Sequence, residues 1–192
     1  MSRAAPLIIT GELPAALQSQ TDALRRAHYP PERNVLAAHV TLFFALPPFV
    51  EDEARTLLAA LAAAQPPPEA RLAQIMDLGT GTAFQIESPD LLAIRDQIAE
   101  HFHGMLTQQD IHRPRLHVTV QNKVERREAR ALQSELAIGF QPQNFRFAGL
   151  ALHRYLGGPW EPAGRWSFRG SSRTSSRTSS RGTSKASSNS RR

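Results

Sequence analysis

The chain has 192 residues, no cysteine and a formal net charge of +6. The lack of cysteine excludes disulfides, thiolate nucleophiles and cysteine-ligated metal sites. No apolar run approaches the ~20 residues that span a bilayer, and the one near the N-terminus is too short for a signal peptide. We therefore expect a cytoplasmic protein with no membrane contact.

The positive charge is concentrated at the C-terminal end. From Arg169 onward there are seven basic and no acidic residues, which leaves residues 1–168 with a net charge of −1. Residues 169–192 are rich in serine and almost free of apolar side chains, so burial cannot offset the entropy cost of ordering them. We expect one domain over 1–168 and a disordered basic tail over 169–192. Such a tail could contact RNA non-specifically, accept phosphate groups or have no role.

Ahead of the tail, strand-like and helix-like stretches alternate, which indicates an α+β fold. Proline and glycine clusters mark most of the boundaries between them. In chain order, the pattern predicts a strand over 6–13, a helix over 13–27, a strand over 38–46, a helix over 51–64, a hairpin over 71–88, a helix over 89–106, a strand over 113–122, a helix over 126–139 and a closing hairpin over 145–168.

The chain contains an internal repeat. His-Val-Thr occurs at 39–41 and again at 117–119, a separation of 78 residues, and a Glu-Ala-Arg triplet follows each copy at a separation of 75 residues. Each copy reads as a strand, a short link and an amphipathic helix. The repeat predicts two lobes related by a pseudo-two-fold axis, with the two histidines at equivalent positions.

Residues i and i+2 of a strand face the same side, so each histidine projects together with the threonine of its tripeptide. If the lobes face a shared cleft, two imidazoles and two hydroxyls converge there. One neutral histidine can then take a proton from an attacking oxygen while a protonated one donates to the leaving oxygen. The hydroxyls can bind the non-bridging oxygens of a phosphoryl group, so the sequence indicates phosphoryl chemistry.

The paired tripeptides resemble the two H-x-T/S motifs of the 2H phosphoesterases, specifically the bacterial proteins named for 2′-5′ RNA ligase activity. The resemblance covers residues 6–168 and extends to GTGTAFQIESPDLLAIRDQIAEHF and RYLGGPWEP. It implies two pseudo-symmetric antiparallel-sheet lobes with outer helices around a central cleft. The implied reaction is metal-independent hydrolysis, or reversible formation, of 2′,3′-cyclic or 2′,5′-linked phosphodiesters of RNA ends or nucleotides.

The same resemblance assigns roles to residues of this chain. It implies that His39 and His117 are the catalytic pair and that Thr41 and Thr119 bind the substrate phosphate. His117 would be the base for hydrolysis and His39 the acid. It implies no cofactor and no metal, and we expect a monomer.

Further residues are predicted to contact substrate. Many relatives carry an arginine just after the second motif, where this chain has Val120-Gln121-Asn122. Arg115, two residues before His117, could replace that arginine, as could Arg154. Alternation along the strand puts Phe43 on the face of the first motif, where it could stack on a base. Tyr155, which alternates with His153 on a predicted strand, could line the cleft.

Two other functions fit the same sequence. One is hydrolysis of a small cyclic phosphate of an ADP-ribose type nucleotide. The other is a non-catalytic RNA-binding protein that uses the cleft and the basic tail. A metal pair at His101 and His103 is disfavoured because residues i and i+2 of a helix diverge. Trp160 and Trp166 are expected in the core of the closing hairpin.

Overall fold

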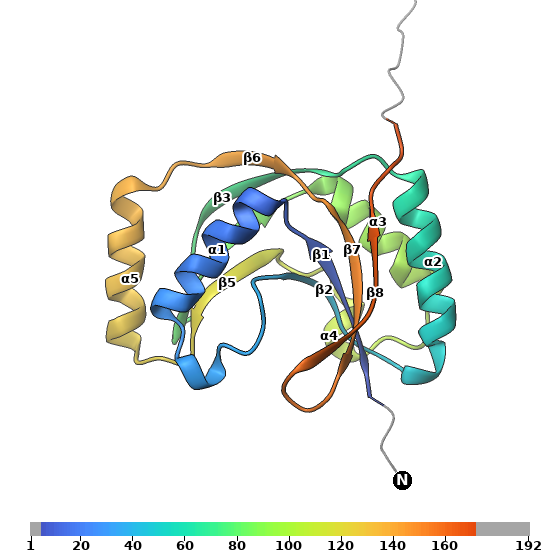
Figure 1. Ribbon diagram of the computed structural model, residues 1–192, viewed down its shortest axis with the longest axis horizontal. Coiled ribbons are helices and arrows are strands. Elements are labelled where there is room, and N and C mark those ends of the chain that lie inside the picture. Colours follow the sequence, from blue (N-terminus) through green and yellow to red (C-terminus); the bar gives the residue numbers. More distant parts are fainter. Residues whose placement is uncertain (1–4, 172–192) are drawn as a thin grey trace, which may run out of the picture.

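The computed structural model describes residues 5–171 and shows an α+β fold of two four-stranded antiparallel sheets flanked by helices (Figure 1). The α+β prediction is therefore confirmed. Most of the predicted tail, residues 172–192, lies outside the described residues. Among those described, no helix has the length and apolar character needed to cross a membrane.

The strands form two sheets with matching orders. Sheet A has the order β2-β1-β7-β8 and sheet B the order β5-β4-β3-β6. Sheet A consists of β1 (Leu7–Glu12), β2 (Val40–Leu46), β7 (Gly149–Tyr155) and β8 (Trp160–Ser167). Sheet B consists of β3 (Glu69–Asp77), β4 (Gly81–Glu87), β5 (His117–Asn122) and β6 (Gln143–Arg146).

Helices cover these sheets, and the two helices of the repeat lie at opposite sides of the view in Figure 1. The helix α2 contacts β7 and β8, whereas α5 contacts β3 and β4. The helical segments are α1 (Ala15–His28), η1 (Pro31–Arg33), η2 (Pro48–Val50), α2 (Glu51–Ala64), α3 (Pro89–His101), α4 (Gln108–Ile111) and α5 (Arg126–Gly139). Local chemistry explains the start of α3: Ser88 caps it by accepting a hydrogen bond from the Leu91 amide, with Pro89 in the first turn.

The internal repeat is expressed as an exchange of strands between the sheets. The first half of the chain supplies β1 and β2 to sheet A but sends β3 into sheet B, beside β4. The second half supplies β4 and β5 to sheet B and sends β7 back to sheet A, beside β1. Each sheet thus needs strands from both halves, and one hydrophobic core extends across them.

Several predicted boundaries differ from the structure. The helix expected to reach residue 106 ends at His101, and the strand expected from 113 begins at His117. The closing hairpin predicted over 145–168 begins at Gly149, because the chain leaves sheet B after Arg146 and then enters sheet A. At the C-terminal end, the amides of Arg169 and Gly170 donate to the Ala62 and Gln65 carbonyls, so ordered contacts extend just past 168.

Candidate active site

The first tripeptide lies at the start of β2. The Nδ1 atom of His39 is 2.8 Å from the carbonyl oxygen of Ala37. A carbonyl can only accept a hydrogen bond, so Nδ1 carries the proton and Nε2 is left with a free lone pair. The local backbone therefore fixes one tautomer of His39, the one in which Nε2 can accept a proton.

The second tripeptide repeats this arrangement at the start of β5. The Nδ1 atom of His117 is 2.7 Å from the carbonyl oxygen of Arg115, again two residues upstream. Both histidines thus point Nε2 away from their own backbone. This shared contact could not be predicted from the tripeptides, because it depends on the conformation of the residue that precedes each histidine.

The two motifs are brought together where the sheets meet. Strands β2 and β5 contact each other, and positive charge on His117 is among the causes that lower the pKa of His39. In each motif the threonine is half-buried, Thr41 opposite Thr10 of β1 and Thr119 opposite Ala83 of β4. The structure therefore brings the strands that carry the two motifs into contact and His117 near enough to His39 to affect its pKa.

Burial controls the charge of His39. Loss of hydration lowers the pKa of His39 to about 4, and repulsion by Arg25, His153 and His117 adds to that effect. The Ala37 carbonyl opposes the shift by favouring the protonated ring. At neutral pH His39 is therefore uncharged and can accept a proton.

Arg25 of α1 connects the two motifs and was not identified from the sequence. Its side chain is buried; Nη1 donates to the Thr119 carbonyl at 2.9 Å and Nε donates to Asn34 Oδ1 at 3.1 Å. The guanidinium also stacks 4.3 Å from the centroid of the Tyr29 ring. A buried cation that holds β5 and repels charge on His39 could be found only from the fold, since it is 94 residues from Thr119.

A cluster of rings lies beside His39 on sheet A. The indole of Trp160 is 4.5 Å from the His39 ring and 5.3 Å from the His153 ring, between centroids. A hydrogen bond of 3.1 Å joins His153 Nε2 to Thr10 Oγ1. These four residues and Arg165 line a cavity of about 380 Å³. Trp160 is thus part of the site, not of the hairpin core as predicted, whereas Trp166 does pack against the core.

The predicted stacking role of Phe43 is wrong. Phe43 is fully buried, and the Arg95 guanidinium lies 4.7 Å from its ring centroid. The physical reason is a β-bulge: Thr10 is opposite Thr41, but Ile9 is opposite Phe43, so an extra residue breaks the alternation. Phe43 therefore faces the core.

The other predicted contacts have different surroundings. Arg115 is exposed beside the second motif, and its Nη2 donates to Gln85 Oε1 at 3.2 Å. Tyr155 is 41% exposed at the end of β7, opposite Trp160. Arg154 is held in ion pairs with Glu51 and Glu161.

No metal cluster is found in residues 5–171: no group of three histidine, cysteine or acidic side chains is close enough to hold an ion. His101, considered for a metal pair, lies with Nε2 2.7 Å from Glu53 Oε1. The adjacent His103 is exposed on the turn after α3.

Comparison with known proteins gives a consistent result. The family model described as the 2′-5′ RNA ligase superfamily matches residues 13–159. A Thermus thermophilus protein superposes with a TM-score of 0.58 at 17% identity, over 86% of this chain and 98% of its own. Escherichia coli LigT in complex with 3′-AMP superposes with a TM-score of 0.55 at 19% identity, over 86% and 99%. LigT in complex with NADP⁺ gives 0.57 at 18% identity, over 87% and 99%.

No curated protein matches the chain significantly. The family match covers well over half of the chain, and the solved relatives share its fold over nearly their whole length. The chain belongs to the 2′-5′ RNA ligase superfamily of 2H phosphoesterases.

Proposed function

We propose that this protein is a phosphoesterase that hydrolyses, or reversibly forms, 2′,3′-cyclic or 2′,5′-linked phosphodiesters with His39 and His117 as its acid–base pair. The observation that carries the proposal is the identical setting of the two imidazoles. Each donates Nδ1–H to the carbonyl two residues upstream and leaves Nε2 for proton transfer. The two tripeptides of the repeat each combine such a histidine with a threonine on the same strand.

For hydrolysis of a cyclic phosphate, water attacks phosphorus and the bond to one ribose oxygen breaks. The neutral His39 takes the proton from the attacking water, and a protonated His117 returns one to the departing ribose oxygen. The Thr41 and Thr119 hydroxyls donate to the non-bridging oxygens. The side chains thus supply base, acid and phosphate contacts, so we propose that the step needs no metal.

This assignment reverses the roles that the family resemblance implies. The reason is the pKa of His39, about 4 in the free protein, which leaves too little protonated imidazole at neutral pH to act as an acid. The pH dependence of kcat/KM reports on the free enzyme and so tests the roles. If His39 is the base, kcat/KM falls as the pH is lowered through about 4. If His39 is the acid, kcat/KM instead falls as the pH is raised above that value.

The deciding experiment is hydrolysis of nucleoside 2′,3′-cyclic monophosphates in EDTA. Loss of either proton-transfer group should reduce kcat by about 10²–10⁴-fold, so we expect that loss in His39→Ala and in His117→Ala. His103→Ala is the matched control, because His103 is exposed and outside the site. Wild-type turnover that survives in both site variants would refute the two-histidine mechanism.

Small nucleotides of the ADP-ribose type are a second candidate substrate class. Escherichia coli LigT has been crystallised with NADP⁺ and with ATP, which favours testing a cyclic phosphate of an ADP-ribose type nucleotide in the same assay. If no cyclic or 2′,5′-linked substrate is turned over, a non-catalytic RNA-binding role becomes the better interpretation. In that case RNA binding should be unchanged in the His39→Ala/His117→Ala variant.

A further inference from the structure

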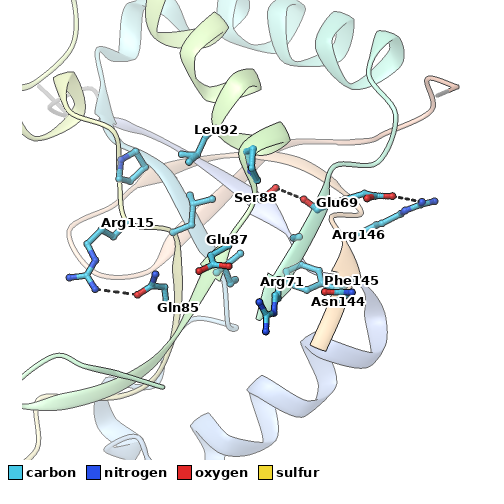
Figure 2. A pocket seen from close by; sticks show the side chains of 15 residues that line it. Glu69, Arg71, Gln85, Glu87, Ser88, Leu92, Arg115, Asn144, Phe145 and Arg146 are labelled. Carbon is cyan, nitrogen blue, oxygen red and sulfur yellow. Dashed lines mark hydrogen bonds and ion pairs between the residues drawn. The ribbon is translucent and has the colours of Figure 1, made fainter. Parts of the chain in front are cut away.

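A groove of about 940 Å³ continues from the second motif across sheet B (Figure 2). It is lined by parts of β3, β4 and β6, the start of α3 and residues 114–116. In Figure 2, Arg115 and Gln85 lie at one end of the groove, and Arg71, Asn144 and Arg146 toward the other. Nothing in the proposed reaction at His39 and His117 uses this space.

The strand register connects the groove to the row of sheet B that contains His117. Gln85 of β4 is directly opposite His117 of β5, so the two side chains share one face of sheet B. Arg115 reaches the same face, because its guanidinium donates to the Gln85 side chain. The groove therefore begins at the residue beside His117.

One row further along, three strands contribute polar side chains in register. Glu87 of β4 is opposite Arg71 of β3, and Arg71 is opposite Asn144 of β6. Rows on one face of a sheet are two residues, or about 7 Å, apart along each strand. An extended single-stranded nucleic acid with one phosphate at His117 would therefore place its next nucleotide over this row.

The charges of the groove favour an anion. Arg146 forms an ion pair with Glu69 at 2.6 Å, but within the described part of the chain no carboxylate lies within ion-pair distance of Arg71 or Arg115. Two arginines thus remain for a ligand against one carboxylate, Glu87, that is likewise outside any such pair. A carboxylate and nearby amides suit ribose hydroxyls and base amino groups, so the row combines phosphate donors with sugar or base acceptors.

We infer that this groove binds the neighbouring nucleotide of a single-stranded RNA whose terminal phosphate reacts at His39 and His117. The inference rests on the proposed function and specifies its substrate class, an oligonucleotide end. Because a 2′,3′-cyclic phosphate ends the chain, the neighbour lies on its 5′ side. Arg71 and Arg115 contact its phosphate, as in other grooves that follow a single-stranded backbone.

The test compares a trinucleotide that ends in a 2′,3′-cyclic phosphate with the matching mononucleotide. We expect wild-type kcat/KM to favour the trinucleotide by at least about tenfold, and Arg71→Gln to reduce that preference about fivefold to tenfold. The salt dependence of trinucleotide binding should weaken by about one unit of logarithmic slope, a change that a purely structural role of Arg71 would not produce. Arg127→Gln, at an exposed position of α5, is the matched control and should keep both the preference and the slope.

Binding is measured in parallel, by fluorescence anisotropy of a labelled trinucleotide with a terminal 3′-phosphate, which does not need turnover. The inference that the groove binds RNA would be overturned if the wild type did not prefer the trinucleotide over the mononucleotide. It would also be overturned if Arg71→Gln kept the wild-type preference and salt slope. Either result would leave the proposed function intact. Absence of turnover on every substrate would overturn the function. In that case, weaker trinucleotide binding in Arg71→Gln but not in Arg127→Gln would still support RNA binding in the groove.

Discussion

The indole of Trp160 covers one side of His39, with 4.5 Å between the ring centroids and 49° between the ring planes. The same indole approaches His153 at 5.3 Å. Burial is the main cause of the low pKa of His39, and Trp160 is the aromatic ring that packs against this imidazole. The electrostatic state of the proposed base thus depends on a residue from the closing hairpin.

Replacing Trp160 with alanine should therefore raise the pKa of His39 from about 4 toward its ordinary value of 6.5, because water regains access to the ring. The shift can be followed by NMR titration of the imidazole protons. The Trp160→Phe variant keeps an aromatic ring and should show a smaller shift. An unchanged pKa in Trp160→Ala would mean that other groups keep His39 desolvated.

The low pKa of His39 also predicts how stability depends on pH. The folded pKa of about 4 lies below the unfolded value of 6.5, so between these values the unfolded chain binds a proton that the folded chain does not. This contribution is fully present above pH 6.5 and is lost as the pH falls through 6.5 toward 4, for a total of about 1–3 kcal/mol. Chemical denaturation of wild type and His39→Gln should therefore show a steeper loss with acid in the wild type.

His153 requires a control in that experiment. Burial, and repulsion by Arg165, lower the pKa of His153 as well, so it adds a loss of stability with the same sign. The acid-induced loss of stability in His153→Gln, compared with the wild type, gives the contribution of His153. The same comparison for His39→Gln gives the contribution of His39. Equal acid sensitivity in wild type and His39→Gln would contradict the low pKa of His39.

Arg25 should affect both the stability of the protein and the pKa of His39. Replacing it with methionine leaves the Thr119 carbonyl and Asn34 without their donors, which should lower the free energy of unfolding by about 1–3 kcal/mol. It also removes a positive charge that lowers the pKa of His39, so that pKa should rise. Arg25→Lys keeps the charge but not the paired contacts, and should restore the His39 pKa more than the stability. If Arg25→Lys restored both equally, charge alone would explain the role.

The sequence was sufficient for most of the helices and strands because their signals are local. Proline and glycine clusters mark the ends of α2 and of the hairpin between β3 and β4, and the helix over Glu51–Ala64 lies where the pattern predicts it. The repeated tripeptides indicated the pair His39 and His117 for the same reason. The exchange of β3 and β7 between the sheets has no local signal and became visible only in the fold.

The errors at the site follow from side-chain direction. A bulge between Thr41 and Phe43 turns Phe43 to the opposite face, and no residue type in that stretch marks it. Trp160 was expected in the core because apolar rings usually lie there, and its position between His39 and His153 depends on the register of β8 with β7. The roles of Arg25 and Arg71 depend on contacts distant in sequence.

Asp110 of α4 supports the strand that carries the first motif. Its carboxylate is buried and accepts hydrogen bonds from the Phe44 and Ala45 amides, at 2.9 Å and 3.0 Å, on the free edge of β2. Thr107 donates to the same carboxylate at 3.0 Å. Asp110 therefore takes the place of a neighbouring strand at this edge.

Removing the carboxylate in Asp110→Ala leaves both amides of β2 without an acceptor. We expect the free energy of unfolding to fall by about 1–3 kcal/mol, because the two amides are part-buried and water can replace only part of the contact that they lose. Glu69→Ala is the control: Glu69 pairs with Arg146 at the surface, and exposed ion pairs contribute about 0–1 kcal/mol. Thermal denaturation of both variants measures the difference. A similar small loss in both would show that water replaces Asp110 at this edge, and that β2 holds Thr41 in place through its pairing with β1 alone.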